Sequence, residues 1–312
     1  MKYIGITGGT GLVGRHLAKL LANDGYEIIV FTRKPGKEYK YIRNTTYAEW
    51  NPLKGKIDTT QLAKVSAMVH LSGEGIADKR WTEQRKTDIV DSRVLGTKFL
   101  VEQLKLHAAN CKVLICSSAI GYYGKDGDGE PFTENARPAD DFLGRTCALW
   151  EAASEDVETN MRRVILRLGI VLAKEGGAFH EFNKPMNFGI MPILGGGEQI
   201  VSWVHVKDVA RAMRFAIERI ELAGIYNVVA PLPVTHSNMV HTMAKNKGWL
   251  KIPIPLPSPL VKLILGEMST EVLKSCTVSS EKIAETGFRF GFRDIETAVK
   301  DILKAKESKT SK

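Results

Sequence analysis

The feature that most constrains the fold is a glycine-rich segment that follows the first apolar run. Residues 3–7 form that run, glycines stand at positions 8, 11 and 14, and residues 12–21 carry apolar side chains at helical spacing. Glycine is needed where a chain turns tightly, approaches a phosphate or lets a helix contact a strand. The N–H groups and positive dipole end of the following helix favour a pyrophosphate. The segment predicts a dinucleotide-binding turn, with an ordinary tight turn as the alternative.

The end of the second predicted strand, residues 26–32, indicates which dinucleotide is bound. An NAD enzyme usually carries an acid about 20 residues beyond the glycines, where it binds the ribose 2′-hydroxyl. This chain carries Thr32, Arg33 and Lys34 there. A guanidinium forms charge-assisted hydrogen bonds with a 2′-phosphate, which an acid would repel. The sequence favours NADP as the cofactor; the alternative is a solvated basic turn, with other residues setting the preference.

Composition limits the chain to a globular protein with one large core, or a core with an appended lobe. Of its 312 residues, 44% are hydrophobic, and no apolar run is long enough to span a membrane. The four cysteines form no CxxC pair, so we expect neither a metal site nor a disulfide framework. No charged and apolar leader precedes the first strand, and we expect a cytoplasmic location.

The net charge of +9 raises the question of nucleic-acid binding. Four lysines lie in the tail at 304–312, of which residues 305–312 are expected to be disordered. A second basic group, at 33–43, lies where a cofactor phosphate is expected. Aromatic and basic residues do not alternate as they do on RNA-binding surfaces. We therefore expect a small-molecule substrate, no nucleic-acid or membrane partner, and either a monomer or a homodimer.

Strand-like runs and helical patterns alternate along the first half of the chain. Strands are expected at 67–71, 112–116 and 163–168, and helices at 82–107 and 142–156. Such alternation predicts an α/β fold, a Rossmann-type doubly wound parallel sheet that binds ligands at the carboxyl ends of its strands.

Residues 1–172 are therefore expected to form an NADP-binding Rossmann domain. Beyond them glycines and prolines become frequent, and we expect 173–304 to form a smaller C-terminal lobe on the substrate side. Parts of this lobe, at 205–230, are expected to return to the sheet.

The loops after the strands complete the set of candidate cofactor residues. Arg93 follows the fourth strand on a helix and either contacts the cofactor or pairs with Asp88 one turn earlier. Arg80 and Trp81 either line a substrate pocket or form a surface lid, and residues 195–199 either clasp a substrate phosphate or form a flexible loop. The candidate cofactor residues are Gly8, Thr10, Gly11, Leu12, Val13, Thr32, Arg33, Lys34, Leu71, Ser72, Gly73, Asp88, Arg93 and Val171.

These motifs resemble the extended short-chain dehydrogenase/reductases, also called the NAD-dependent epimerase/dehydratase family. Residues 7–14 match its TGxxGxxG, residues 117–124 its serine-rich loop ending in Tyr-Gly, and residues 203–208 its W-[IV]-H-V-x-D. The chain is most similar to the atypical YfcH-like subgroup, on the pattern that includes Gly73-Glu74 and Trp150-Glu151. That resemblance implies an extra C-terminal domain of unknown function at about 250–304.

One departure from the family concerns its catalytic Tyr-x3-Lys pair. That spacing puts both side chains on one helical face, where the lysine lowers the pKa of the tyrosine. None of the eight tyrosines has a lysine four residues on. Phe142 stands in the expected helix where the tyrosine would be, and Ala119 occupies the catalytic Ser/Thr position.

The remaining catalytic candidates are Ser118, Tyr122 and Tyr123 at the end of the fifth strand. The alternative for the tyrosines is aromatic packing beside the cofactor. His205 and Asp208 are interpreted as a polar network at a helix start, with Asp208 as the cap; the alternative is a role in the chemistry.

Together these features favour an NADP-binding oxidoreductase or epimerase-like protein that acts on a small substrate, with nucleotide-linked compounds implied by the resemblance. The alternative function is a non-catalytic NADP-binding sensor or scaffold that has lost the Tyr-x3-Lys chemistry.

Overall fold

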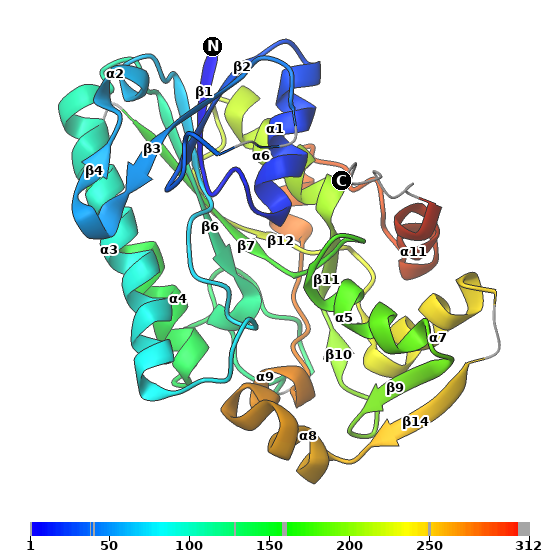
Figure 1. Ribbon diagram of the computed structural model, residues 1–312. Coiled ribbons are helices and arrows are strands. Elements are labelled where there is room, and N and C mark those ends of the chain that lie inside the picture. Colours follow the sequence, from blue (N-terminus) through cyan, green and yellow to red (C-terminus); the bar gives the residue numbers. More distant parts are fainter. Residues whose placement is uncertain are drawn as a thin grey trace.

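The computed structural model describes residues 2–37, 39, 41–127, 129–157, 161–248 and 251–304. Within them, the central sheet has eight strands, which in spatial order are β12 (Gly224–Val228), β7 (Arg162–Leu168), β6 (Val113–Ala119), β5 (Ala67–His70), β1 (Tyr3–Thr7), β2 (Glu27–Thr32), β3 (Thr45–Asn51) and β4 (Lys56–Ile57) (Figure 1). Neighbouring strands run parallel, except that β4 is antiparallel to β3. The chain order reverses between β1 and β5, and doubly wound sheets bind ligands at such a switch point. The expected Rossmann-type α/β fold is confirmed.

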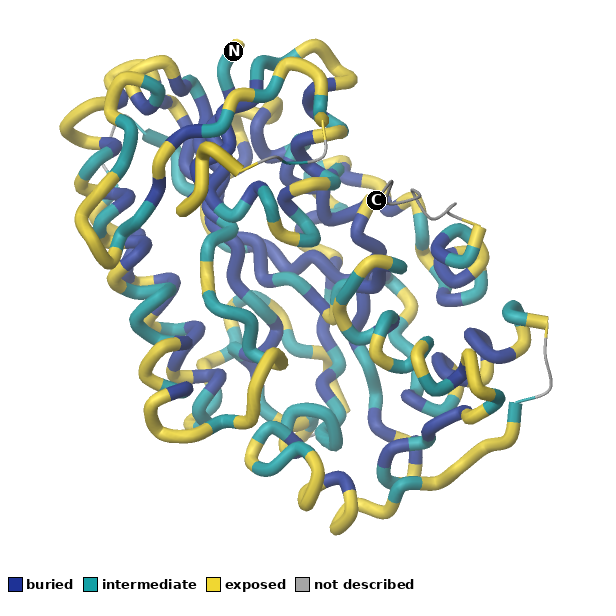
Figure 2. Tube along the Cα trace, in the orientation of Figure 1, coloured by how far each residue is buried: buried dark blue, intermediate teal, exposed yellow. Residues whose placement is uncertain are grey.

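Helices cover both faces of this sheet. They are α1 (Leu12–Asn23), α2 (Thr59–Leu62), α3 (Glu83–His107), α4 (Phe142–Ala152) and α6 (Val206–Glu218), with short turns η1 (Pro52–Lys54) and η2 (Ile120–Tyr122). Because strand side chains alternate between faces, Ile28 and Val30 pack in the cluster with α1 and α6, whereas Ile29 and Phe31 pack in the cluster with α3. Figure 2 shows that the central strands are largely buried, as is typical of a parallel sheet that helices cover on both faces.

The rest of the chain forms small paired strands and short helices beside the sheet. The strand pairs are β8 (Ile170–Leu172) with β11 (Trp203–His205), β9 (Ile190–Leu194) with β14 (Ile252–Leu256), and β10 (Ile200–Val201) with β13 (Val234–Thr235). The helices are α5 (Gly177–Met186), α7 (His236–Asn246), α8 (Ser258–Leu265), η3 (Gly266–Met268), α9 (Ser269–Leu273), α10 (Glu281–Glu285) and α11 (Ile295–Lys304). Apolar side chains of β8, β9, β11, α5, α7 and α11 form a separate core, whose most deeply buried members include Phe179, Trp203 and Met239.

Two elements beyond residue 172 belong to the central sheet layer. Strand β12 pairs with β7, and α6 packs against α1.

The predicted strands and helices fall within a few residues of the observed ones. The largest difference is at α4, which ends at Ala152 instead of 156. The tail at 305–312 lies outside the described residues.

Strand β14 lies at a free edge and contains prolines at alternate positions. The N–H of Ile252 donates to the Gly189 carbonyl, and the carbonyl of Leu256 accepts from Gly195, so these residues face β9. Pro253 and Pro255 face the opposite edge, where proline offers no N–H group. Figure 2 shows this strand largely exposed.

Candidate functional site

The turn between β1 and α1 has close contacts that require glycine. Gly8 has a φ of +69°, and a Cβ there would lie 2.7 Å from the carbonyl carbon of Leu71 and 2.9 Å from the nitrogen of Ser72. A Cβ on Gly14 would overlap the carbonyl oxygen of Gly8, so α1 packs directly against the turn. Gly11 is less crowded, because its Cβ would lie 3.2 Å from that oxygen. Side chains at Gly8 and Gly14 would therefore disturb the turn itself.

Helix α1 begins with N–H groups that have no side-chain partner. Gly11 is its N-cap residue, and within the described chain no side chain caps the helix and no acid lies in its first turn. The backbone carbonyl of Thr10 accepts a hydrogen bond from the Arg15 side chain at 2.9 Å. Val13 packs against the core. Such a helix start favours a phosphate or pyrophosphate group.

Loops from three regions of the chain meet at this edge of the sheet. The N–H of Leu71 donates to the Thr7 carbonyl, which places the loop after β5 beside the loop after β1. A Cβ on Gly177 would lie 2.9 Å from the Val171 carbonyl oxygen and 3.7 Å from a methyl of Leu12. The segment after β8 therefore lies near the start of α1, and contact of Val171 and Leu12 with a cofactor stays a prediction.

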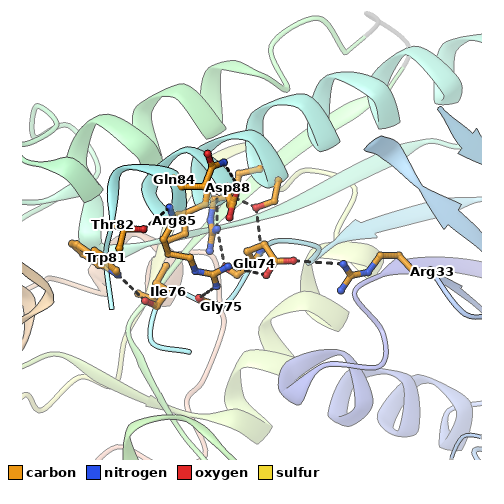
Figure 3. A network of polar contacts seen from close by, with 12 residues as sticks. Arg33, Glu74, Gly75, Ile76, Trp81, Thr82, Gln84, Arg85 and Asp88 are labelled. Atoms are coloured by element: carbon orange, nitrogen blue, oxygen red, sulfur yellow. Dashed lines mark hydrogen bonds and ion pairs between the residues drawn. The ribbon is translucent and has the colours of Figure 1, made fainter. Parts of the chain in front are cut away.

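Arg33 lies at the end of β2 and points toward an acid on another loop (Figure 3). Its side chain is 70% exposed, and its Nη1 lies 3.5 Å from Oε1 of Glu74, whose Oε2 accepts from Arg85 at 3.2 Å. The hydroxyl of Thr32 lies 3.1 Å from the Tyr39 hydroxyl and accepts a long hydrogen bond from the Lys34 N–H. Within the described part of the chain, the Arg33 side chain is thus held by one long contact to Glu74.

Sequence reasoning missed Glu74 and Arg85. It looked for an acid at the end of β2, whereas the structure supplies one from the loop after β5. The Arg85 side chain is only 9% exposed and also donates to the Gly75 carbonyl at 2.6 Å, so Glu74 has a fixed partner on its other side. The sequence showed Gly73-Glu74 as a motif that resembles the family's, but it did not show that Glu74 contacts Arg33.

Arg93 and Asp88 lie on α3 and do not contact each other. Arg93 donates to the carbonyls of Glu74 and Ile89 at 3.0 and 3.1 Å, and a Cβ on Gly73 would lie 3.2 Å from its guanidinium carbon. Asp88 accepts from Gln84 at 2.9 Å (Figure 3). The ion pair considered from the sequence is not formed among the described residues, and contact with a cofactor stays a prediction for both.

A buried hydrogen-bond network underlies the loop after β6. Ser118 donates to Glu151 at 2.6 Å, and Arg167 donates to both oxygens of the same carboxylate at 2.8 Å. Arg167 also donates to the Tyr123 hydroxyl at 2.9 Å, and that hydroxyl donates to Asn227 at 2.7 Å. The Arg167 side chain is 1% exposed, so a desolvated ion pair lies at the centre of this network.

The two tyrosines of this loop differ in their environments. Tyr123 is fully buried and stacks on Phe132 at 5.2 Å, and burial raises the pKa of its phenol to about 12. Tyr122 is half-buried, and the guanidinium carbon of Arg167 lies 3.4 Å from its ring centre. Its hydroxyl makes no hydrogen bond to the described part of the chain. These contacts favour the packing interpretation for Tyr123, while the catalytic roles of Ser118, Tyr122 and Tyr123 stay predictions.

Phe142, which the sequence places at the position expected for the family's tyrosine, begins α4. Asp141 is the N-cap of this helix and accepts from the Gly144 N–H at 2.7 Å. The Phe142 ring packs edge-on against Trp81, with ring centres 4.9 Å apart. Both rings line a cleft.

The polar network at the start of α6 is present, but its cap is not Asp208. His205 is the N-cap, and its Nδ1 accepts from the Lys207 N–H at 3.1 Å. Asp208 lies inside the first turn, fully buried, and accepts from the N–H groups of Gly291 and Phe292 at 2.9 Å. The expected capping role of Asp208 was wrong, because its carboxylate instead fixes a distant backbone segment.

The loop at 195–199 is anchored at one end by Gln199. This side chain is 7% exposed and donates to the carbonyls of Leu194 and Val272 at 3.1 and 3.3 Å. The loop is therefore tied to the C-terminal extension at that end.

The cysteines and possible metal ligands decide whether the described part of the chain holds a disulfide or a metal site. All four cysteines are buried without disulfides, and burial raises the pKa of the Cys147 thiol, for example, to about 12. Among the described residues, no three His, Cys, Asp or Glu side chains are placed to hold a metal ion. The described helices also include none with the length and apolar character needed to cross a membrane.

Two family models match the chain. The NAD dependent epimerase/dehydratase family covers residues 4–229, and a domain of unknown function, DUF1731, covers residues 256–302. The epimerase family protein YfhF of Bacillus subtilis is 33% identical over 305 residues, covering 96% of this chain and 97% of the relative. The epimerase family protein ML0860 of Mycobacterium leprae is 32% identical, with 95% and 94% covered.

Solved structures agree with the fold. Human epimerase family protein SDR39U1, crystallised with NADPH, has a TM-score of 0.84 at 27% identity, covering 96% of this chain and 98% of that chain. A nucleoside-diphosphate sugar epimerase from Corynebacterium glutamicum has a TM-score of 0.75 at 29% identity, covering 97% of this chain and 58% of that chain. The resemblance expected from the sequence is confirmed, including the extra C-terminal domain.

Proposed function

Because the chain belongs to the NAD dependent epimerase/dehydratase family, we propose that it is an NADP-binding enzyme that acts on a small substrate. The observation that carries this proposal is Arg33, which follows β2 with its side chain 70% exposed and, among the residues that the structure describes, one 3.5 Å contact to Glu74. A doubly charged 2′-phosphate is a stronger partner for a guanidinium than one distant carboxylate. The human relative SDR39U1, which was crystallised with NADPH, supports the same choice.

The residues at the switch point fit a dinucleotide. The glycine contacts at Gly8 and Gly14 leave backbone free of side chains, and the uncapped start of α1 offers N–H groups for the pyrophosphate. Arg33 and Lys34 would hold the 2′-phosphate, and residues 71–73 would flank the nucleotide. NADP would supply hydride transfer when bound.

A proton donor or acceptor for the substrate has to come from outside α4, since the sequence lacks Tyr-x3-Lys. We assign this role to Tyr122, because its hydroxyl is not bound within the described chain, while that of Tyr123 both donates and accepts. Arg167 packs on the Tyr122 ring and holds it in place. A positioned phenol is a recognised general acid or base.

The second candidate function is a non-catalytic NADP sensor. The observation that favours it is the hydroxyl of Ser118, which is committed to Glu151 at 2.6 Å and is 2% exposed. If Tyr122 is equally inactive, the site would bind NADP without turning over a substrate.

Cofactor binding is tested by thermal unfolding with and without NADPH. At a hundredfold excess over Kd, a ligand stabilises the native state by about 2.7 kcal/mol. Gly11→Val is expected to remove this stabilisation while the unliganded protein still unfolds cooperatively, and Gly11→Ala serves as the milder control. Full NADPH stabilisation in Gly11→Val would contradict the assignment of this turn.

Catalysis is tested separately by following NADPH oxidation with a panel of carbonyl compounds and nucleotide-linked sugars. A turned-over substrate supports the enzyme, and Tyr122→Phe should then lower kcat roughly 10²- to 10⁴-fold with NADPH affinity unchanged. NADPH binding without turnover across the panel would favour the sensor. Turnover that survives Tyr122→Phe would show that the proton donor lies elsewhere.

A further inference from the structure

A cleft lies between the family domain and the C-terminal extension, on the side of the sheet where α3 and α4 begin. Its volume is about 1030 Å³, and its walls come from the first turns of α3 and α4 and from α8 and α9. In Figure 1 these elements meet at the lower end of the molecule. The extension therefore builds one side of a cavity large enough for a small organic ligand.

Ion pairs hold the two sides of this cleft in a fixed arrangement. Lys86 on α3 contacts Glu267 of the extension at 3.0 Å. Lys274, whose side chain is 12% exposed, contacts Asp141 at 3.3 Å and Glu271 at 2.9 Å. Burial lowers the pKa of Lys274, but the two carboxylates more than offset this and leave the pKa above its ordinary value. The cleft is thus built from paired charges.

The cleft adjoins the loop that carries the proposed proton donor. The ammonium group of Lys274 donates to the Tyr123 carbonyl at 3.2 Å, one residue from Tyr122. Lys125, two residues further along the same loop, lines the cleft directly. A ligand in the cleft would therefore lie against the loop after β6.

One wall of the cleft is aromatic. Trp81 and Phe142 pack edge to face with ring centres 4.9 Å apart, and Val90 and Leu273 extend the apolar lining. The indole N–H of Trp81 donates to the Ile76 carbonyl at 2.8 Å, so it is not available to a ligand (Figure 3). Such a surface favours a flat ring.

The charges that remain unpaired around the cleft are mostly positive. Lys125 and Lys262 form no ion pair with described residues, and Arg145 contacts only the carbonyl of Asp140. Against these cations, Asp91 is the lining acid without a partner in the described chain. A surplus of free cations beside an aromatic wall favours an anionic ligand with a ring.

We propose that this cleft is the substrate-binding site, and that it takes a small organic anion in which a carboxylate or phosphate is attached to a flat ring. This inference rests on the proposed function only for the claim that the ligand is a substrate; the binding itself is independent of NADP. Trp81 and Phe142 would contact the ring, while Lys125 and Lys262 would attract the anionic group. The unassigned C-terminal extension then has a role, as the wall that supplies Lys262 and positions Lys274.

The test is calorimetric titration of the full chain, saturated with NADPH, with benzoate and phenyl phosphate. Benzyl alcohol tests the need for charge, and ribose 5-phosphate tests the need for a flat ring. Both aromatic anions are expected to bind at least tenfold more tightly than either control compound. Equal affinities, or no heat from either aromatic anion at millimolar concentration, would overturn the proposal.

Three variants locate the binding. Trp81→Ala and Lys262→Ala are each expected to weaken phenyl phosphate roughly tenfold, while Lys19→Ala, an exposed lysine on α1 at the opposite end of the molecule, has no effect. Unchanged affinity in both cleft variants would place the ligand elsewhere and overturn the proposal. NADPH titrations of the same variants should match wild type, so failure of the anion site and failure of the cofactor proposal are distinguishable.

Discussion

Two arginine–glutamate pairs of this molecule have opposite surroundings. Arg167 and Glu151 lie beneath the loop after β6 with side chains 1% and 9% exposed, whereas Arg33 and Glu74 lie at the cofactor edge with 70% and 35% exposed. The first pair has two 2.8 Å hydrogen bonds, and the second a single 3.5 Å contact. The desolvated pair Arg167–Glu151 thus fixes the scaffold, whereas the exposed pair Arg33–Glu74 leaves its arginine free to exchange partners.

Removing Arg167 is expected to have the largest effect. Arg167→Met leaves the carboxylate of Glu151 buried and unpaired, which typically costs about 3–5 kcal/mol of unfolding free energy. Urea unfolding measures it. The double variant Arg167→Met with Glu151→Met should recover much of the loss, because neither charge remains. A single variant as stable as wild type would show that the buried pair is not a scaffold element.

His70 is a second buried polar group of the scaffold, and it makes the stability of the scaffold depend on pH. It lies at the end of β5 with its nitrogens 2.6 and 3.0 Å from the hydroxyls of Thr7 and Thr97, and burial lowers its pKa to about 4. The unfolded chain therefore takes up a proton near pH 6.5, before the folded chain does, and stability falls as the pH drops from 6.5 to 4. The loss is about 3 kcal/mol in this window. Compared with wild type, His70→Asn should show a flatter stability–pH curve there, and an equally steep curve would contradict the assignment.

Arg33 tests the ligand-facing pair. A charged hydrogen bond is worth roughly 1.5–3 kcal/mol, so Arg33→Ala should weaken NADP roughly 10- to 150-fold. NAD affinity and unfolding free energy should hardly change, since the side chain is exposed. Lys34→Ala serves as the neighbouring control and should lose less, because an ammonium group lacks the planar fork. Equal losses for NAD and NADP in Arg33→Ala would give the residue a structural role.

Glu74 gives the smallest expected effect. Glu74→Gln removes the charge that competes with a 2′-phosphate for Arg33, and exposed ion pairs are worth about 0–1 kcal/mol. NADP affinity should rise by less than about fivefold, as titration would reveal. A tenfold weakening would instead mean that Glu74 holds Arg33 in place, and that the exposed pair is as fixed as the buried one.

The parts of the site that were predictable from sequence depend on local patterns. The glycine turn, the end of β2 and the loop after β5 each follow from an apolar run that ends in small or polar residues, and the strand period assigns them to one edge of the sheet. The position of Arg33 directly after β2 was predicted in this way, whereas its role at the cofactor stays a prediction. Its partner Glu74 was not predicted, because β1 separates β2 from β5 and no local pattern reports which side chains meet across it.

The buried network was beyond sequence reasoning for a related reason. Ser118, Arg167 and Asn227 are register partners on β6, β7 and β12, and Glu151 joins them from α4, which packs against β6. The sequence identified Tyr123 as a candidate but not its burial. Asp208 was mistaken for a helix cap, since a backbone segment more than eighty residues away takes its carboxylate.

The alternating prolines of β14 have a consequence for contacts between molecules. A strand of another chain that docked against this edge would find carbonyl oxygens but no N–H donors at Pro253 and Pro255, so half of each potential ladder would be missing. Ile252 and Ile254 are 64% and 39% exposed on this strand. Without the prolines, this exposed apolar edge would favour aggregation. The prolines thus oppose edge-to-edge strand pairing between molecules. The two isoleucines stay accessible only to partners that pack against the face of the strand.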